Sequence, residues 1–98
     1  MMLKIKFFEW DRNKSKSNIQ KHGISFQEAE TIFYDEYAVT ADDDEHSQDE
    51  DRFIIVGESK KLRILLACYC HRGNDTIRII SARKATKVEM DWYEEDWQ

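Results

Sequence analysis

The chain has 98 residues, of which 41% are hydrophobic and 36% charged, and its formal net charge is −5. A chain of this size encloses one hydrophobic core, so residues 1–98 are expected to form a single domain. It has no stretch as long as the ~20 apolar residues of a membrane span and no run typical of a signal peptide, so we expect a cytoplasmic protein.

The first predicted element is a β-strand within residues 3–10, LKIKFFEW. Apolar and charged residues alternate here, which is the period of a strand with one buried face. The alternation predicts that Leu3, Ile5 and Phe7 are buried and that the lysines between them point to the opposite side.

Two helices are predicted next. Asp11 is a suitable N-cap for a polar helix that ends at Gly23, where a left-handed residue is usually required. Ser25 and Glu28 form a capping box, in which the Ser25 hydroxyl accepts from the N–H of Glu28 and the Glu28 carboxylate accepts from the N–H of Ser25. The box begins a second helix with an apolar stripe toward the core and Glu28 turned away from it. The stripe consists of Phe26, Ala29, Ile32 and Phe33.

The rest of the chain predicts four strands and a final helix. Residues 38–51 begin as a strand and become an acidic loop, and the apolar runs at 52–59, 61–71 and 75–83 follow as an antiparallel meander. A second capping box begins the final helix. It joins Thr86 to Glu89, and the i,i+4 pairs expected after it are Val88 with Trp92 and Tyr93 with Trp97. The predicted order is β-α-α-β-β-β-β-α, an α+β fold with helices packed on an antiparallel sheet.

Residues 8–33, FEWDRNKSKSNIQKHGISFQEAETIF, carry a distinctive motif. It resembles the N-terminal signature of the BrnT family of toxins, in which Phe-x-Trp-Asp is followed by a lysine, an asparagine and Lys-His-Gly. The C-terminal half matches as well, through the run IRIISARKAT at residues 77–86 and the residues around it. The matching residues are Phe8, Trp10, Asp11, Lys14, Asn18, Lys21, His22, Gly23, Phe26, Glu28, Ala29, Asp51, Arg52, Phe53, Gly57, Tyr69, Arg72, Glu89 and Tyr93.

The resemblance covers nearly the whole chain and implies a RelE-like fold and ribonuclease activity. It also implies a toxin of a bacterial type II toxin–antitoxin pair, neutralised by a ribbon-helix-helix antitoxin that is encoded next to it and represses the operon. Contact with operator DNA is then expected only through the antitoxin, and a heterotetramer with the antitoxin is one assembly that satisfies this. The segment 68–71, CYCH, departs from the family pattern, so the resemblance implies no role for it.

Charge is segregated along the chain. Residues 1–24, 25–51, 52–87 and 88–98 carry net charges of +4, −11, +7 and −5. Folding can gather the basic blocks into a cationic surface that binds a phosphate polymer such as RNA. The alternative is that folding interleaves the blocks, so that they neutralise each other.

Three arginines are candidates for RNA chemistry. RNA is cleaved without metal when a base removes the 2′-hydroxyl proton, cations stabilise the phosphorane and an acid protonates the leaving oxygen. Arg52, Arg78 and Arg83 suit the second task because a guanidinium pairs two phosphate oxygens, and Lys84 beside them is a candidate RNA contact. On a regular strand Arg78 and Arg83 point to opposite faces, so they converge only if the strand has a bulge or ends near Ser81. The alternative for Arg78 is a structural ion pair with the acidic loop or a helix carboxylate.

The first helix presents a second candidate surface. Its predicted RNA-binding face consists of Lys14, Asn18, Lys21 and His22, which leaves Ser15 and Ile19 toward the sheet. His22 is a candidate general acid, because histidine titrates near neutrality and a helix C-terminus favours its protonated form. The alternative is a histidine that only caps the helix.

Metal chemistry is not predicted. The acidic loop 42–51 lacks the glycine of a calcium loop, and the chain has no zinc motif. Cys68 and Cys70 share a strand face, cannot readily bridge each other and are expected to be buried reduced thiols. His46 is expected to be a solvated side chain of the acidic loop. The resemblance implies an endoribonuclease that inhibits translation, and the absence of a metal motif adds the expectation that it acts without a metal ion or other cofactor. The alternative is a non-catalytic module that binds nucleic acid or an antitoxin.

Overall fold

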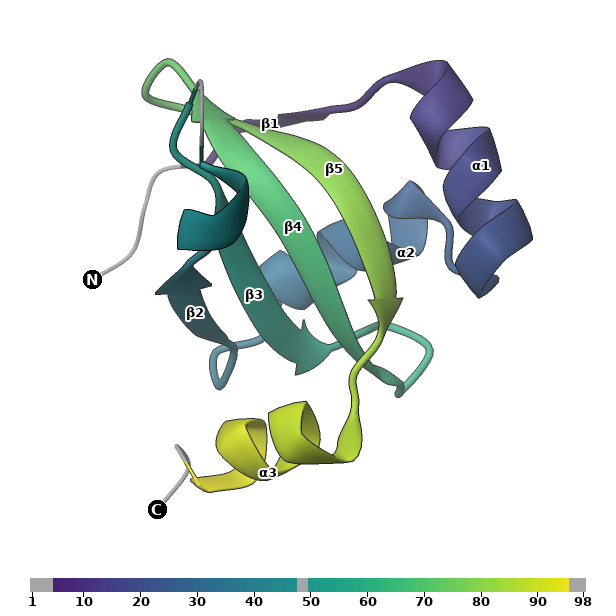
Figure 1. Cartoon of the computed structure of the whole chain (residues 1–98), viewed down its shortest axis with the longest axis vertical. Coiled ribbons are helices and arrows are strands. Elements are labelled where there is room, and N and C mark those ends of the chain that lie inside the picture. The colour runs from purple at the N-terminus through teal and green to yellow at the C-terminus, as the bar shows by residue number, and fades with distance from the viewer. Residues whose placement is uncertain (1–4, 48–49, 96–98) are drawn as a thin grey trace.

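The computed structural model describes residues 5–47 and 50–95. Its strands are β1 (Phe7–Glu9), β2 (Val39–Asp42), β3 (Phe53–Glu58), β4 (Ile64–Arg72) and β5 (Thr76–Lys84). Its α-helices are α1 (Arg12–His22), α2 (Phe26–Thr31) and α3 (Lys87–Glu95), and two short 3-10 helices are η1 (Ile32–Tyr34) and η2 (Asp44–His46). The predicted order of strands and α-helices is confirmed (Figure 1). No helix in the described residues is long and apolar enough to cross a membrane.

The five strands form one sheet in the order β1-β5-β4-β3-β2. The pairs β5–β4, β4–β3 and β3–β2 are antiparallel, as predicted. Strand β1, in contrast, pairs parallel with residues 76–78 of β5. The prediction of an entirely antiparallel sheet was therefore wrong at one edge. Parallel pairing is possible there because most of the chain separates β1 from β5, which provides the long crossover that parallel neighbours require.

The two faces of the sheet are covered unequally. On one face, Phe26 and Ala29 of α2 and Ile32 of η1 pack against strand residues that include Ile55 and Ile79, and this forms the main core. On the other face, a smaller cluster gathers around Tyr93 of α3, which covers only one end of the sheet (Figure 1). The other end of this second face, near the β4–β5 turn, carries no α-helix within the described residues. We call this region the open half of the sheet.

The predicted alternation of the first strand was wrong in phase. Phe7 is 59% exposed, whereas Phe8 packs against the core, with its ring 5.3 Å from that of Phe33. Ile5 is partly buried against the core as expected, and Leu3 lies outside the described residues. Only three residues of β1 are paired with β5. The position of β5 therefore determines which side chain of β1 faces the core, and the alternation of apolar and charged residues does not.

The predicted helix boundaries are confirmed by their caps. Asp11 accepts from the backbone N–H groups of Asn13 and Lys14 at 2.8 and 3.0 Å, and Gly23 ends α1 with a φ of 70°. Both halves of the capping box between Thr86 and Glu89 are present, at 3.3 and 2.9 Å.

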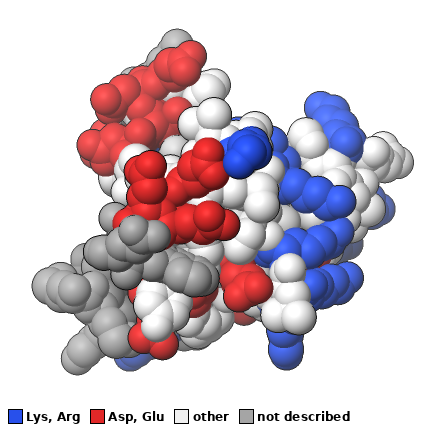
Figure 2. Space-filling view, turned by 90° about the horizontal axis from the view of Figure 1, so that it is seen from below, with Lys and Arg blue, Asp and Glu red and all other residues white. Residues whose placement is uncertain are grey.

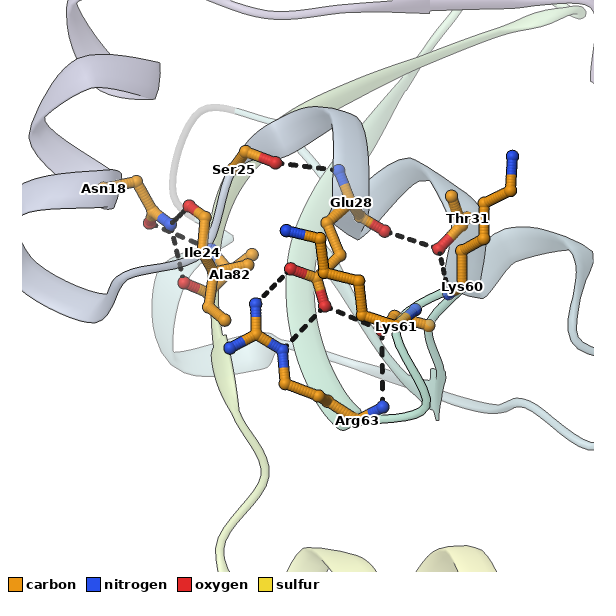
Figure 3. Close-up of polar contacts among 10 residues, drawn as sticks. Asn18, Ile24, Ser25, Glu28, Thr31, Lys60, Lys61, Arg63 and Ala82 are labelled. Carbon is orange, nitrogen blue, oxygen red and sulfur yellow. Dashed lines mark hydrogen bonds and ion pairs between the residues drawn. The ribbon is translucent and has the colours of Figure 1, made fainter.

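The capping box between Ser25 and Glu28 is present only in part. The Ser25 hydroxyl accepts from the N–H of Glu28 at 3.0 Å, but the Glu28 carboxylate does not return to Ser25. It is buried and accepts instead from the guanidinium of Arg63 and the hydroxyl of Ser59, on the β3–β4 hairpin (Figure 3). A buried carboxylate requires a paired charge, and Arg63 supplies it and lowers the pKa of Glu28.

Trp92 of the final helix packs against the cluster around Tyr93, whereas Val88, its predicted i,i+4 partner, is 76% exposed. The pairing of these two residues stays a prediction. The pair of Tyr93 with Trp97 involves a residue outside the described ones. Tyr93 itself is buried, and its hydroxyl donates to Asp35 at 2.5 Å.

Helix α1 lies along the outer edge of β5 (Figure 1), where one buried side chain joins it to the strand. Asn18 donates to the carbonyl oxygens of Ala82 and Ile24 at 2.8 and 2.9 Å, and it accepts from the N–H of Ala82 at 3.1 Å (Figure 3). Since β1 pairs only with residues 76–78, the Asn18 amide takes the place of a strand partner further along β5. This orientation leaves Ile19 exposed, which contradicts the predicted sheet-facing role of that residue.

Candidate active site

A β-bulge sets the direction of the arginine side chains on β5. Tyr69 of β4 pairs with Ile79 and Cys68 pairs with Ser81, so Ile80 has no partner in the register. Ile79 and Ala82 are both in the main core although they are three residues apart. Arg78 and Arg83 therefore share the opposite face of the sheet, which fulfils one of the two conditions stated from the sequence.

Three arginines meet two glutamates on the open half of the sheet. Arg78 Nη1 lies 2.8 Å from Glu9 Oε2, and Arg72 Nε lies 3.9 Å from the same oxygen. Glu50 joins the remaining members, because its oxygens lie 3.5 Å from Arg72 Nη1 and 4.0 Å from Arg52 Nε. We call Arg52, Arg72 and Arg78 the arginine cluster. Its members come from β5, from β4 and from the residue before β3, so only the folded sheet brings them together.

The arginine cluster has unused capacity to bind an anion. The three guanidinium groups form ion pairs with two carboxylates, and each of these five side chains is between 31% and 48% exposed. The hydrogen bond with Glu9 raises the pKa of Arg78, so this cation stays charged at any physiological pH. Among the described residues, the buried Nε of Arg52 has no hydrogen-bond acceptor. An anionic ligand can therefore add contacts as well as replace the glutamates.

Arg83 does not join the arginine cluster. Its guanidinium makes two hydrogen bonds to the carboxylate of Glu89 in α3, at 2.7 and 2.9 Å. This pairing lowers the pKa of Glu89 to about 2 and connects β5 to the final helix. The bulge therefore does not bring Arg83 to Arg78, because it places them on one face but at opposite ends of the strand. Lys84, the next residue, is exposed.

The surface predicted for α1 is only partly present. Asn18 is buried and its amide bonds backbone groups, so the structure does not place it on the exposed face with the lysines, and its role in binding RNA stays a prediction. Lys14, Lys21 and His22 are exposed. The backbone N–H groups of Lys14 and Asn13 lower the pKa of Asp11, at the start of α1, and the charge of Arg78 makes a smaller contribution in the same direction. His22 lies at the other end of the helix, about 16 Å away for eleven residues at 1.5 Å each.

Sequence reasoning missed four members of this region. Arg72 and Cys70 are two residues apart on β4, so their side chains point to the same face of the sheet. This spacing could have indicated from the sequence on which face Arg72 lies. No local pattern assigns Glu9 and Glu50 to the same place, because one belongs to β1 and the other to the acidic loop. The fourth is His46, expected to be merely solvated, whose Nδ1 lies 3.0 Å from Asp43 Oδ1.

The two cysteines lie beneath this region as buried free thiols, as predicted. Burial, with a smaller contribution from the neighbouring Asp43, raises the pKa of Cys68 to about 12. A thiol that remains protonated is a poor nucleophile and a poor metal ligand. Within residues 5–47 and 50–95, no group of three His, Cys, Asp or Glu side chains is placed to hold a metal ion.

The folded chain both gathers basic residues on one surface and pairs some of them with acidic residues. Figure 2 shows Asp and Glu gathered on one side of the visible face and Lys and Arg on the other, so the segregation in sequence persists on the surface. At the open half of the sheet, however, Glu9 and Glu50 come between the arginines. A cationic surface and local neutralisation therefore coexist.

Residues 10–89 match the family described as the ribonuclease toxin, BrnT, of type II toxin–antitoxin systems. The structure is similar to the crystal structure of the Brucella abortus ribonuclease toxin BrnT, with a TM-score of 0.64 and 26% sequence identity over 83% of this chain and 97% of that one. Comparison with curated proteins gives no match. Since the family match spans most of the sequence, the chain belongs to the BrnT family of ribonuclease toxins of type II toxin–antitoxin systems.

Proposed function

We propose that the chain is an endoribonuclease that cleaves RNA without a metal ion, with the arginine cluster as the site of the scissile phosphate. The observation that carries this proposal is the convergence of Arg52, Arg72 and Arg78 on the open half of the sheet, which no α-helix of the described residues covers. Guanidinium groups bind phosphate oxygens in pairs and stabilise the charge that develops on a phosphorane.

The glutamates of the site are readily displaced by a phosphate. Ion pairs between partly exposed side chains contribute only about 0 to 1 kcal/mol, so exchange of a carboxylate for a phosphate costs little. Glu9 and Glu50 then keep the arginines extended and in place while no RNA is bound.

The remaining cations are proposed to contact RNA on either side of the scissile phosphate. Lys14, Lys21 and Lys84 are exposed, and the described residues provide none of them with an ion pair. His22 is proposed to belong to this flanking surface. Its distance from the start of α1 separates it from the arginine cluster, so the structure favours an RNA contact over the general acid proposed from the sequence.

Membership of a type II toxin–antitoxin family implies an antitoxin partner. We propose that this partner is a ribbon-helix-helix protein encoded next to the toxin, that it neutralises the toxin in a heterotetramer, and that operator DNA is bound only through it. RNA cleavage in the cytoplasm would then inhibit translation once the antitoxin is lost.

Cleavage of RNA by the purified chain in excess EDTA tests the proposed function. We expect products with 2′,3′-cyclic phosphate and 5′-hydroxyl ends, because attack by the 2′ oxygen requires no metal-bound water. Activity that disappears with EDTA and returns with a divalent cation would contradict the mechanism. Tight, salt-dependent RNA binding without cleavage at any pH would support a non-catalytic binding module instead.

A further inference from the structure

The turn that contains η2 holds a histidine against a carboxylate. His46 Nδ1 lies 3.0 and 3.1 Å from the two oxygens of Asp43. An ionised carboxylate only accepts hydrogen bonds, so Nδ1 carries the hydrogen and the lone pair of a neutral imidazole is on Nε2. The His46 side chain is 63% exposed, whereas that of Asp43 is 16% exposed. Asp43 therefore holds the imidazole ring in place, while the basic nitrogen of His46, Nε2, is on the exposed side chain.

This turn is attached to Arg52, a member of the arginine cluster. The N–H of Asp43 donates to the carbonyl oxygen of Arg52 at 2.8 Å, and the N–H of Arg52 donates to Ser47 Oγ at 2.9 Å. The Cys68 thiol donates to Asp43 Oδ2 at 3.4 Å, from the same sheet face as the arginine cluster. In Figure 1, η2 lies in front of the sheet, on the face that α3 covers at its other end. The turn that carries His46 is thus held by hydrogen bonds to the backbone of Arg52, a residue of the proposed phosphate site.

The other two histidines lack these features. His22 stands at the far end of α1, and no carboxylate contacts it within the described residues. His71 packs against the rings of Phe53 and Tyr69, on the face that carries the main core. Of the three histidines, His46 alone combines a carboxylate partner with a position beside an arginine of the cluster.

We propose that His46, oriented by Asp43, is the general base of the cleavage reaction. Nε2 takes the proton of the 2′-hydroxyl while the 2′ oxygen forms a bond to phosphorus, and the arginine cluster stabilises the phosphorane. The bond from phosphorus to the 5′ oxygen then breaks, and that oxygen takes a proton from water. The hydroxide left behind is neutralised by the protonated imidazole, so the enzyme returns to its starting state.

The charged groups around His46 are consistent with this role. Asp43 contacts the ring directly, Asp44 and Glu45 belong to the same turn, and Arg52 with Glu50 lies at the end of the adjacent strand. Cys68 reaches the pair only through Asp43. Because a base must be unprotonated to act, the cleavage rate of the parent protein should fall as the pH falls.

Four variants test the inference, which rests on the proposed function. His46→Ala should lower the single-turnover rate of RNA cleavage on the order of a hundredfold and should remove the decline at low pH, with RNA affinity nearly unchanged. Asp43→Asn should lower the rate less, since an amide still orients the ring but no longer stabilises the imidazolium. The double variant should be no slower than His46→Ala, because the two residues act as one unit. His71→Ala is the matched control and should retain the parent rate.

Chemical rescue provides a readout that a merely structural role would not give. Added imidazole should restore part of the rate of His46→Gly but none of the rate of Arg78→Ala. If the parent cleaves RNA in EDTA and His46→Ala, folded by circular dichroism, cleaves as fast with the same pH profile, the inference is wrong and the proposed function stands. If the parent itself does not cleave RNA, the proposed function fails, and the inference fails with it.

Discussion

Arg78→Ala should lower the turnover of RNA cleavage on the order of a hundredfold or more, with little change in the thermal midpoint. Under the proposed function this guanidinium stabilises the transition state, so its removal lowers the rate of the chemical step. The ion pair it removes, with Glu9, is partly exposed on both sides, and such pairs contribute about 0 to 1 kcal/mol to stability. Single-turnover cleavage and thermal unfolding of the same preparation measure both quantities.

Two further variants make this result specific. Arg78→Lys should recover only part of the rate, because an ammonium lacks the planar pair of donors. Arg83→Ala changes an arginine of the same strand and the same sheet face, yet it should cleave within a few-fold of the parent per folded molecule, since Arg83 binds Glu89. Equal losses of rate in Arg78→Ala and Arg83→Ala would return Arg83 to the site and contradict the assignment.

Asn18→Ala should be the most destabilising single change in α1. It leaves the N–H and carbonyl of Ala82 and the carbonyl of Ile24 without their partner, and each buried unpaired group costs about 1 to 3 kcal/mol. Partial access of water reduces the sum, so we expect a loss of about 2 to 4 kcal/mol in the free energy of unfolding. For a domain of this size, that lowers the thermal midpoint by roughly 10 to 20 °C.

Asn13→Ala is the matched control for Asn18→Ala. Asn13 lies in the same helix but is exposed, and only its backbone N–H takes part in the cap, so its replacement should change stability by less than about 0.5 kcal/mol. Faster hydrogen exchange at the amide of Ala82 in Asn18→Ala would locate the effect at the strand edge. An Asn18→Ala protein as stable as Asn13→Ala but weaker in RNA binding would instead support the role predicted from the sequence.

Local features of this fold could be predicted from the sequence because local chemistry determines them. Asp11, Gly23 and Thr86 act within one turn of their own helix, and their roles were confirmed. At Glu28, local chemistry did not predict the partner of the side chain. Its capping geometry was available locally, but Arg63, 35 residues away, offers a charged partner in a buried place. A distant partner that satisfies a buried charge prevails over a local hydrogen bond.

The candidate active site could be predicted only in part, because it depends on tertiary arrangement. Arg52 and Arg78 were identified from the chemistry of arginine, but the bulge at Ile80 and the parallel edge strand decide which side chains meet them. Glu9 reaches Arg78 only because β1 joins β5, and no pattern within either strand indicates that pairing. The bond of Asn18 to β5 could not be predicted, because a polar residue in a polar helix carries no sign that it will bond a strand edge.

The central claim is that the arginine cluster binds the scissile phosphate, and arginine side-chain NMR tests it most directly. The side-chain Nε–Hε signals would be followed during titration with an RNA oligonucleotide fully modified as 2′-O-methyl, which binds but has no 2′-hydroxyl to react. We predict that the signals of Arg52, Arg72 and Arg78 shift in a saturable way, while those of Arg63 and Arg83, held by Glu28 and Glu89, remain in place. Saturable binding that leaves the three cluster signals unmoved would contradict the account.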